Sequence, residues 1–163
     1  MEKHRSKTIV LGIGNRLRKD DAAGSIVAEL LKDRDTDILA IDSETTPENW
    51  TGKIARMNPE KIIIVDTANF NGKPGDFRIL RENQIDWYGF STHTLPISFV
   101  IEDLKSRCSA EIILLGIQPK NTDFGEDISP EVKKSIHITI DLLDNREDNL
   151  NICLLYTSPS PRD

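Results

Sequence analysis

Apolar residues along the chain gather in short runs, separated by segments in which they recur every three or four positions. Short runs rich in β-branched residues are typical of strands that are buried on both faces of a sheet. The predicted strands are residues 8–13, 38–41, 61–65, 76–80 and 111–117. The run at 76–80 follows a turn cluster at 71–75 instead of a helix, which favours antiparallel pairing for that strand.

The intervening segments predict helices. Their apolar stripes are Ile26, Val27, Leu30 and Leu31, then Ile97, Val100, Ile101 and Leu104, and finally Val132, Ile136, Ile140 and Leu143. A further helix is predicted from residue 47 to about residue 57, because Pro47 suits a first helical turn. Asp20 or Asp21 is expected to cap the first helix, and Thr94 the third, with Pro96 in its first turn. This alternation predicts the α/β class, in three layers, with a twisted, mostly parallel five-stranded sheet between helices.

The length of 163 residues suits one compact domain, which we assign to residues 1–152. Residues 153–163, CLLYTSPSPRD, break the composition of everything before them. Back-translated, the start of this segment matches a transposon-based sequencing adapter. We therefore interpret residues 153–163 as a non-native tail, produced when the reading frame ran into adapter DNA, and exclude them from the fold prediction.

Charge and hydropathy exclude two classes of partner. The formal net charge is −6, and lysine and arginine are scattered along the chain, which argues against a nucleic-acid-binding surface. The longest apolar runs are too short to cross a bilayer, so no membrane insertion is expected. The charged start leads directly into a predicted strand and not into a signal peptide. We therefore expect a cytoplasmic protein.

Acidic residues follow three of the predicted strands. Asp20 and Asp21 come after the first strand, Asp42 after the second and Asp66 after the third. Because sites in open α/β sheets form outside the carboxyl ends of the strands, these carboxylates are expected along one edge. Carboxylates gathered there repel one another unless a cation, a shared proton or helix N-termini compensate. A metal ion is the simplest such compensation.

One histidine is placed to add a nitrogen ligand at that edge. His93 lies in the predicted loop before the third helix, whereas His4 is near the N-terminus and His137 is within the last helix. A structural reading stays open for each candidate residue. Asp21 could act only as a helix cap, Asp66 as a turn former and His93 as a solvated loop residue.

The pair of glycines at Gly12 and Gly14 does not indicate a nucleotide site. The next glycine is Gly24, so the G-x-G-x-x-G pattern fails, and there is no Walker sequence. Acidic residues also fill the turn in which a pyrophosphate would need amide donors.

Four segments resemble the motifs of the hydrogenase maturation endopeptidases. They are GIGNRL at 12–17 with DDAAG at 20–24, IIVDTA at 63–68, STHTLP at 91–96, and LGIQP at 115–119. The last is similar to a motif of the branch that serves formate-hydrogenlyase-type and related energy-conserving hydrogenases. The match runs from about residue 8 to residue 143 with the motifs in the right order. The family usually has glycines directly after the second-strand aspartate, whereas Ser43 and Glu44 follow Asp42 here.

The resemblance implies an endopeptidase that removes the C-terminal extension of a nickel–iron hydrogenase large-subunit precursor after nickel has been inserted. It implies that Asp21, Asp66 and His93 are the catalytic and nickel-binding residues, with Asp42 as a possible supporting acid. We expect the nickel to be carried by the precursor and not bound permanently, and we expect a monomer. Our hypothesis is that the three residues read the nickel, so that unloaded precursors are ignored.

The mechanism and two rival functions stay open at this point. Either the metal or a carboxylate pair could activate water, whereas no serine or cysteine lies in a recognisable nucleophile motif. One rival is a non-catalytic chaperone that holds the nickel-loaded precursor. The other is a general metal-dependent hydrolase of small substrates, which would bind metal tightly and act without a protein partner.

Overall fold

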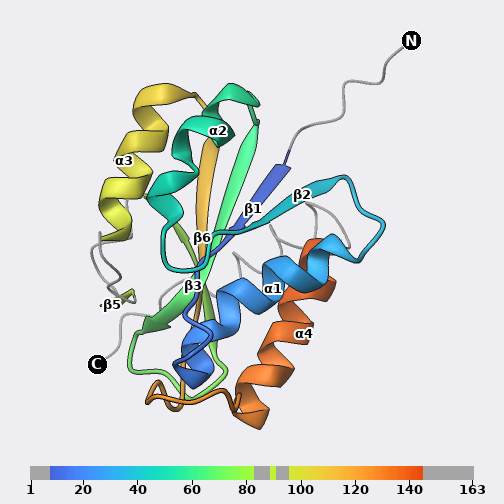
Figure 1. Cartoon of the computed structure of the whole chain (residues 1–163), viewed down its shortest axis with the longest axis vertical. Coiled ribbons are helices and arrows are strands. Elements are labelled where there is room, and N and C mark those ends of the chain that lie inside the picture. Colours follow the sequence, from blue (N-terminus) through green and yellow to red (C-terminus); the bar gives the residue numbers. More distant parts are fainter. Residues whose placement is uncertain (1–7, 83–88, 91–95, 145–163) are drawn as a thin grey trace.

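A computed structural model describes residues 8–82, 89–90 and 96–144 of the chain (Figure 1). Its strands are β1 (Thr8–Gly12), β2 (Ile38–Asp42), β3 (Lys61–Asn69), β4 (Phe77–Arg81), β5 (Gly89–Phe90) and β6 (Glu111–Ile117). Five of them form one twisted sheet in the order β2-β1-β3-β6-β4, and β5 pairs with the end of β3. The first four strands of that order are mutually parallel, and β4 is antiparallel at one edge.

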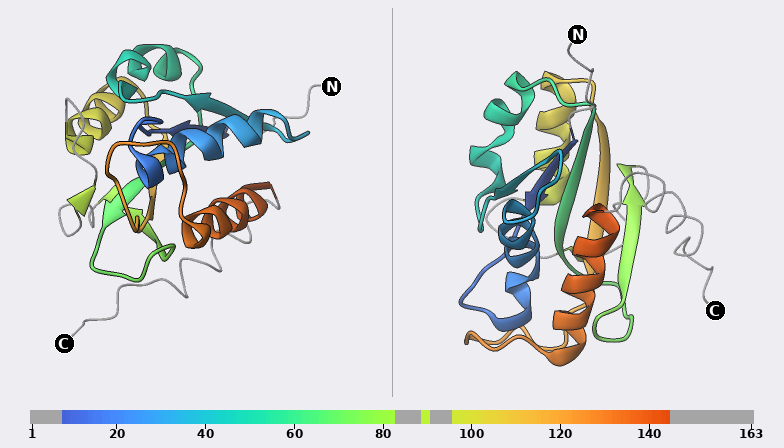
Figure 2. Two further views of the ribbon diagram at one scale, coloured as in Figure 1. Left: turned by 60° about the horizontal axis from the view of Figure 1, so that its bottom comes forward. Right: turned by 90° about the vertical axis from the view of Figure 1, so that its right-hand side faces the viewer.

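Helices cover both faces of this sheet. Figure 1 shows α2 (Thr51–Arg56) beside α3 (Ile97–Arg107), and α1 (Ala23–Lys32) beside α4 (Pro130–Asp144). Two short 3-10 helices, η1 (Lys19–Ala22) and η2 (Pro47–Asn49), precede α1 and α2. The two views of Figure 2 show the sheet between these two pairs of helices, so that the molecule has three layers.

The alternation of side chains along β3 divides the core between the two faces. Ile62 and Ile64 pack with the buried residues of α2 and α3, whereas Ile63 and Val65 pack with those of α1 and α4. Because both faces are covered, β3 is apolar at successive positions, as the sequence pattern indicated.

The structure confirms the α/β class, the five-stranded sheet and the antiparallel strand near 76–80. The predicted inward stripes of the third and fourth helices are buried, and Val27 and Leu31 of the first helix are buried with them. The two-residue strand β5 is an addition that the sequence did not indicate.

Three local predictions were wrong. The helix expected from residue 47 to about residue 57 is divided into η2 and α2, with Trp50 between them. The third strand does not end before Asp66 but continues to Asn69, because β6 and β5 both supply hydrogen-bonding partners to this part of the chain. Neither Asp20 nor Asp21 caps α1, since both lie inside η1.

Some expectations fall outside the described residues. These are the Thr94 cap, the position of His93 and the nature of the tail at residues 153–163. Pro96 is described and occupies the position just before α3, not its first turn, which makes a fourth local prediction that was wrong. Within the described ranges, no helix is long and apolar enough to span a membrane.

Candidate functional site

Asp21 is fixed against the centre of the sheet by its main chain and its side chain. Its amide N–H donates to the carbonyl oxygen of Arg18 at 3.0 Å, and its own carbonyl oxygen accepts the N–H of Asn15 at 3.0 Å. The hydroxyl of Thr67 on β3 donates to Asp21 Oδ1 at 2.7 Å. The turn between β1 and η1 therefore closes on Asp21, and the carboxylate of Asp21 is held at β3.

Asp66 lies one residue before Thr67 on the same strand. Its side chain is 0% exposed, and its Oδ1 accepts the N–H of Thr67 at 2.8 Å. Asp66 pairs in register with Gly116 of β6. Since successive residues of a strand point to opposite faces, Asp66 belongs to the face covered by α2 and α3, and Thr67 to the face covered by α1.

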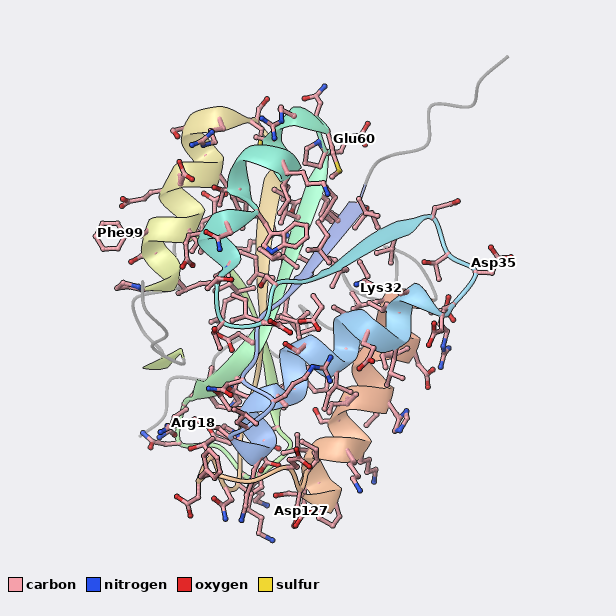
Figure 3. All side chains as sticks on the ribbon, viewed as in Figure 1. Arg18, Lys32, Asp35, Glu60, Phe99 and Asp127 are labelled. Atoms are coloured by element: carbon pink, nitrogen blue, oxygen red, sulfur yellow. The ribbon has the colours of Figure 1, made fainter. Side chains whose placement is uncertain are left out.

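The end of β1 makes an opening beside this part of β3. β1 ends at Gly12, which is in register with Val65, so its ladder with β3 stops before Asp66, and β5 pairs with β3 only at Ala68 and Asn69. Side chains from the two faces can approach each other past the end of a neighbouring strand. This is the carboxyl edge at which open α/β sheets form their sites. In Figure 3, Arg18 and Asp127 lie at this end of the molecule, and Glu60, just before β3, lies at the opposite end.

Two glycines let α1 pack directly on the backbone of the sheet. A Cβ atom at Gly24 would lie 2.2 Å from the carbonyl oxygens of both Ile13 and Val65. A Cβ atom at Gly12 would lie 2.2 Å from the carbonyl oxygen of Gly24. Only glycine permits this close approach, and the approach is what brings η1, with Asp21, up to β3.

Asp20 anchors η1 from the other side. Its fully buried carboxylate accepts the N–H groups of Lys120, Asn121 and Ser129, at 2.9, 3.0 and 2.7 Å, and the hydroxyl of Ser129 at 2.7 Å. Burial is the strongest single effect on the pKa of Asp20 and raises it. The hydrogen bonds from Ser129, Asn121 and Lys120 together outweigh burial and hold the pKa below its ordinary value. Asp20 thus stays ionised and ties η1 to the segment between β6 and α4.

Asp42, the supporting candidate, is engaged in a separate ion pair. Arg16 contacts Asp42 Oδ2 at 2.9 Å and also contacts Glu29 at 2.9 Å. Burial is the strongest single effect on the pKa of Asp42, and it raises that pKa. Hydrogen bonds from Arg16, Ser25 and the N–H of Glu44 outweigh burial and hold the pKa of Asp42 below its ordinary value. The contact with Arg16 links Asp42 to the 12–17 segment.

The departure from the usual glycines after Asp42 has a visible consequence. Glu44 has a positive φ of 52°, in the left-handed region that favours glycine. Its carbonyl oxygen accepts the N–H of Gly14 at 2.9 Å, and the hydroxyl of Ser43 donates to the carbonyl oxygen of Gly12 at 2.8 Å. The chain therefore keeps the turn that glycine favours, although another residue occupies it.

Sequence reasoning gave no role to Thr67 or Gln118, and it treated Asp20 only as a possible helix cap and one of the acids at the edge. Thr67 positions Asp21, and Asp20 anchors η1. Gln118 accepts the N–H groups of Phe70 and Gly72 through Oε1 and donates to Asn69 through Nε2, which fixes the turn after β3. All three lie inside the motifs quoted above, but hydrogen bonds to residues distant in sequence do not follow from spacing.

The described residues supply two of the three expected ligands. Asp21 and Asp66 lie on or against β3, whereas His93 falls in the segment before α3 that is not described. Among the described residues, no group of three His, Cys, Asp or Glu side chains could hold a metal ion. Two carboxylates at this edge therefore need a further ligand from elsewhere, and carboxylate oxygens with an imidazole nitrogen make a donor set that suits a divalent first-row metal.

Comparisons with known proteins agree on one family. The family model for the hydrogenase maturation protease HycI matches residues 25–145. A protein of Methanocaldococcus jannaschii assigned as a hydrogenase maturation protease is 39% identical over 142 residues, which cover 82% of this chain and 83% of the relative. The Escherichia coli hydrogenase 3 maturation protease is 29% identical over 143 residues, which cover 86% of this chain and 91% of the relative. The crystal structure of the nickel–iron hydrogenase maturation protease HycI from Thermococcus kodakarensis is similar with a TM-score of 0.76, at 32% identity, over 87% of this chain and 92% of that one.

Proposed function

Because the chain belongs to the hydrogenase maturation protease family, we propose that it removes the C-terminal extension of a nickel–iron hydrogenase large-subunit precursor. In this proposal the precursor carries nickel, and the nickel is part of the substrate. The protein is thus an endopeptidase of hydrogenase maturation, which acts on another protein and not on a small molecule.

The proposal assigns the nickel contacts to Asp21, Asp66 and His93. The observation that carries it is the hydrogen bond from Thr67 to Asp21, which holds one carboxylate at the strand that bears the other. The helix that follows His93 packs on the face of the sheet to which Asp66 belongs. Three protein ligands leave coordination positions open for groups of the precursor, as recognition of a metal held by another protein requires.

Nickel recognition gives this site its specificity. A precursor without the ion would bring no positive charge to the carboxylates, and their mutual repulsion would remain. When bound, the ion supplies Lewis-acid character to the edge of the sheet. Asp21 and Asp66 also provide carboxylates that can accept a proton from an attacking water, and Asp42, paired with Arg16, supports the loop that leads to Asp21.

The direct test removes one candidate ligand at a time. We expect Asp66→Ala and His93→Ala to abolish the faster-migrating, processed form of the precursor on a denaturing gel. Arg34→Ala is a matched control, because Arg34 pairs with Asp141 and Asp144 of α4, away from the carboxyl edge. Unchanged processing by both site variants would remove the metal-reading proposal, whereas loss with the control would indicate a general folding defect.

The two rival functions differ in what they leave behind. A chaperone that only holds the precursor releases it with an unchanged mass. A general hydrolase binds metal tightly on its own and turns over small substrates without the precursor. Isothermal titration of the purified protein with nickel, in the absence of precursor, separates the second rival from the proposal, which requires weak binding by the isolated protein.

A further inference from the structure

Two large apolar side chains project into solvent next to the candidate site. Leu17 is 54% exposed and Phe124 is 80% exposed, the largest value among the exposed large hydrophobic residues that the structure describes. Leu17 lies in the turn between β1 and η1, and Phe124 lies in the segment between β6 and α4. We call these two residues the apolar pair.

The backbone places the two residues of the apolar pair beside each other. The N–H of Gly125 donates to the carbonyl oxygen of Leu17 at 2.8 Å, and the N–H of Lys19 donates to the carbonyl oxygen of Gly125 at 2.8 Å. These bonds form a parallel bridge between Arg18 and Gly125. Leu17 and Phe124 each directly precede one of the two bridged residues, so they lie on two segments that the bridge holds side by side.

Both segments are fixed by the residues of the site. Asp21 closes the turn that carries Leu17, through its bonds to Asn15 and Arg18. The buried carboxylate of Asp20 holds the segment that carries Phe124 at three backbone N–H groups. The apolar pair is therefore displayed on a backbone that is already ordered, and its position is linked directly to that of Asp21.

Large apolar side chains on a fixed backbone have the character of a protein contact. Centres of protein interfaces are depleted in charge and enriched in aromatic residues, and a few such side chains supply most of the binding energy. Contacts made by groups that are ordered beforehand lose less conformational entropy on binding. An apolar surface on the partner protein fits such a pair.

We propose that the apolar pair is a docking contact for the folded large-subunit precursor, which it holds beside Asp21 while the extension is cut. This rests on the proposed function, which makes the substrate a protein. The precursor is the partner that fits because the pair is continuous with the site. A second copy of this chain bound at the same place would lie against the turn that Asp21 closes and would hinder access to the site.

The test compares two double variants of the full chain with purified nickel-loaded precursor. For Leu17→Ser with Phe124→Ser, we expect KM for processing to rise about tenfold, the effect of losing roughly 1.4 kcal/mol of binding. We expect kcat to stay within about twofold and the thermal unfolding midpoint to stay unchanged, because exposed side chains contribute little to folding. The control is Leu39→Ser with Ile138→Ser, which removes exposed apolar residues from β2 and α4 and should leave KM unchanged.

Three results would overturn the proposal. They are an unchanged KM in the Leu17 and Phe124 variant, an equal rise in the control, and a wild-type dimer that this variant converts to monomer in light scattering. Titration of intact precursor into each protein measures docking without cleavage. If the wild type binds but does not cleave, the proposed function fails, and weaker binding by the Leu17 and Phe124 variant would still support the docking contact.

Discussion

An alanine at Gly24 should separate α1 from the sheet and carry Asp21 away from β3. The added Cβ would lie 2.2 Å from two carbonyl oxygens, those of Ile13 and Val65, and such contacts do not fall below 3.0 Å. Both oxygens belong to the backbone, so no side-chain rotation relieves the clash, and the start of α1 must withdraw by about the 0.8 Å difference. The same displacement at Asp21 lengthens its 2.7 Å contact with Thr67 to about 3.5 Å, the limit of a hydrogen bond.

This displacement should affect activity more than folding. A misplacement of about 1 Å in an active site can lower the rate by about 10²-fold, and overpacking of a core costs about 1–3 kcal/mol. We expect Gly24→Ala to lower kcat/KM for precursor processing by about that factor and to lower the free energy of unfolding in urea by about that amount. Gly52→Ala is the matched control, because its Cβ would meet only the flexible end of Arg107, at 3.4 Å. Wild-type kcat/KM and stability in Gly24→Ala would show that α1 accommodates the added methyl group without moving Asp21.

Three further substitutions test individual contacts. Asp20→Asn should lower the free energy of unfolding at neutral pH by about 2–3 kcal/mol, the scale of charge-assisted hydrogen bonds. The folded-state pKa of Asp20 is depressed, so this stabilisation is present above the ordinary carboxyl pKa of about 3.9 and is lost as pH falls through the lower folded value. The free energies of unfolding of the wild type and Asp20→Asn, measured by urea titration across that pH range, should therefore converge at acid pH. A constant difference between the two proteins would contradict the assignment. Thr67→Val keeps the shape of the side chain but removes the hydroxyl that donates to Asp21. We expect kcat/KM to fall about fivefold, which corresponds to about 1 kcal/mol in activation free energy. An unchanged kcat/KM would show that this contact does not position Asp21. Glu44→Gly should raise the free energy of unfolding by up to about 1 kcal/mol, seen as a higher urea midpoint, because glycine adopts the positive φ without strain. A lower midpoint would mean that contacts of the Glu44 side chain stabilise the fold by more than the strained φ destabilises it.

The sequence predicted the fold well where hydrophobic burial decides the structure. β1, β2 and β6 lie close to the predicted limits because their apolar runs are covered on both faces. The prediction was wrong at β3 because it treated Asp66 as a strand-ending residue. Pairing with β6 and β5 carries the strand on to Asn69, and such pairing depends on segments remote in sequence.

The approach of Asp21 to β3 was predictable from the sequence, but the contacts that hold it there were not. The position of acids after parallel strands indicated that Asp21 would approach the strand of Asp66, and the hydrogen bond through Thr67 is the form that this approach takes. The two acids at positions 20 and 21 are alike in sequence yet differ in role. The carboxylate of Asp20 faces the segment before α4, whereas that of Asp21 faces β3, and only the tertiary structure separates these directions.

The most direct test of the account is a mass measurement on the precursor. Purified nickel-loaded and nickel-free large-subunit precursors are incubated in parallel with the protein, and the products are weighed by mass spectrometry. We expect the loaded precursor to be converted to two complementary fragments by a single cut near its C-terminus, while the nickel-free precursor keeps its full mass. An intact loaded precursor, or equal cleavage of both, would contradict the account.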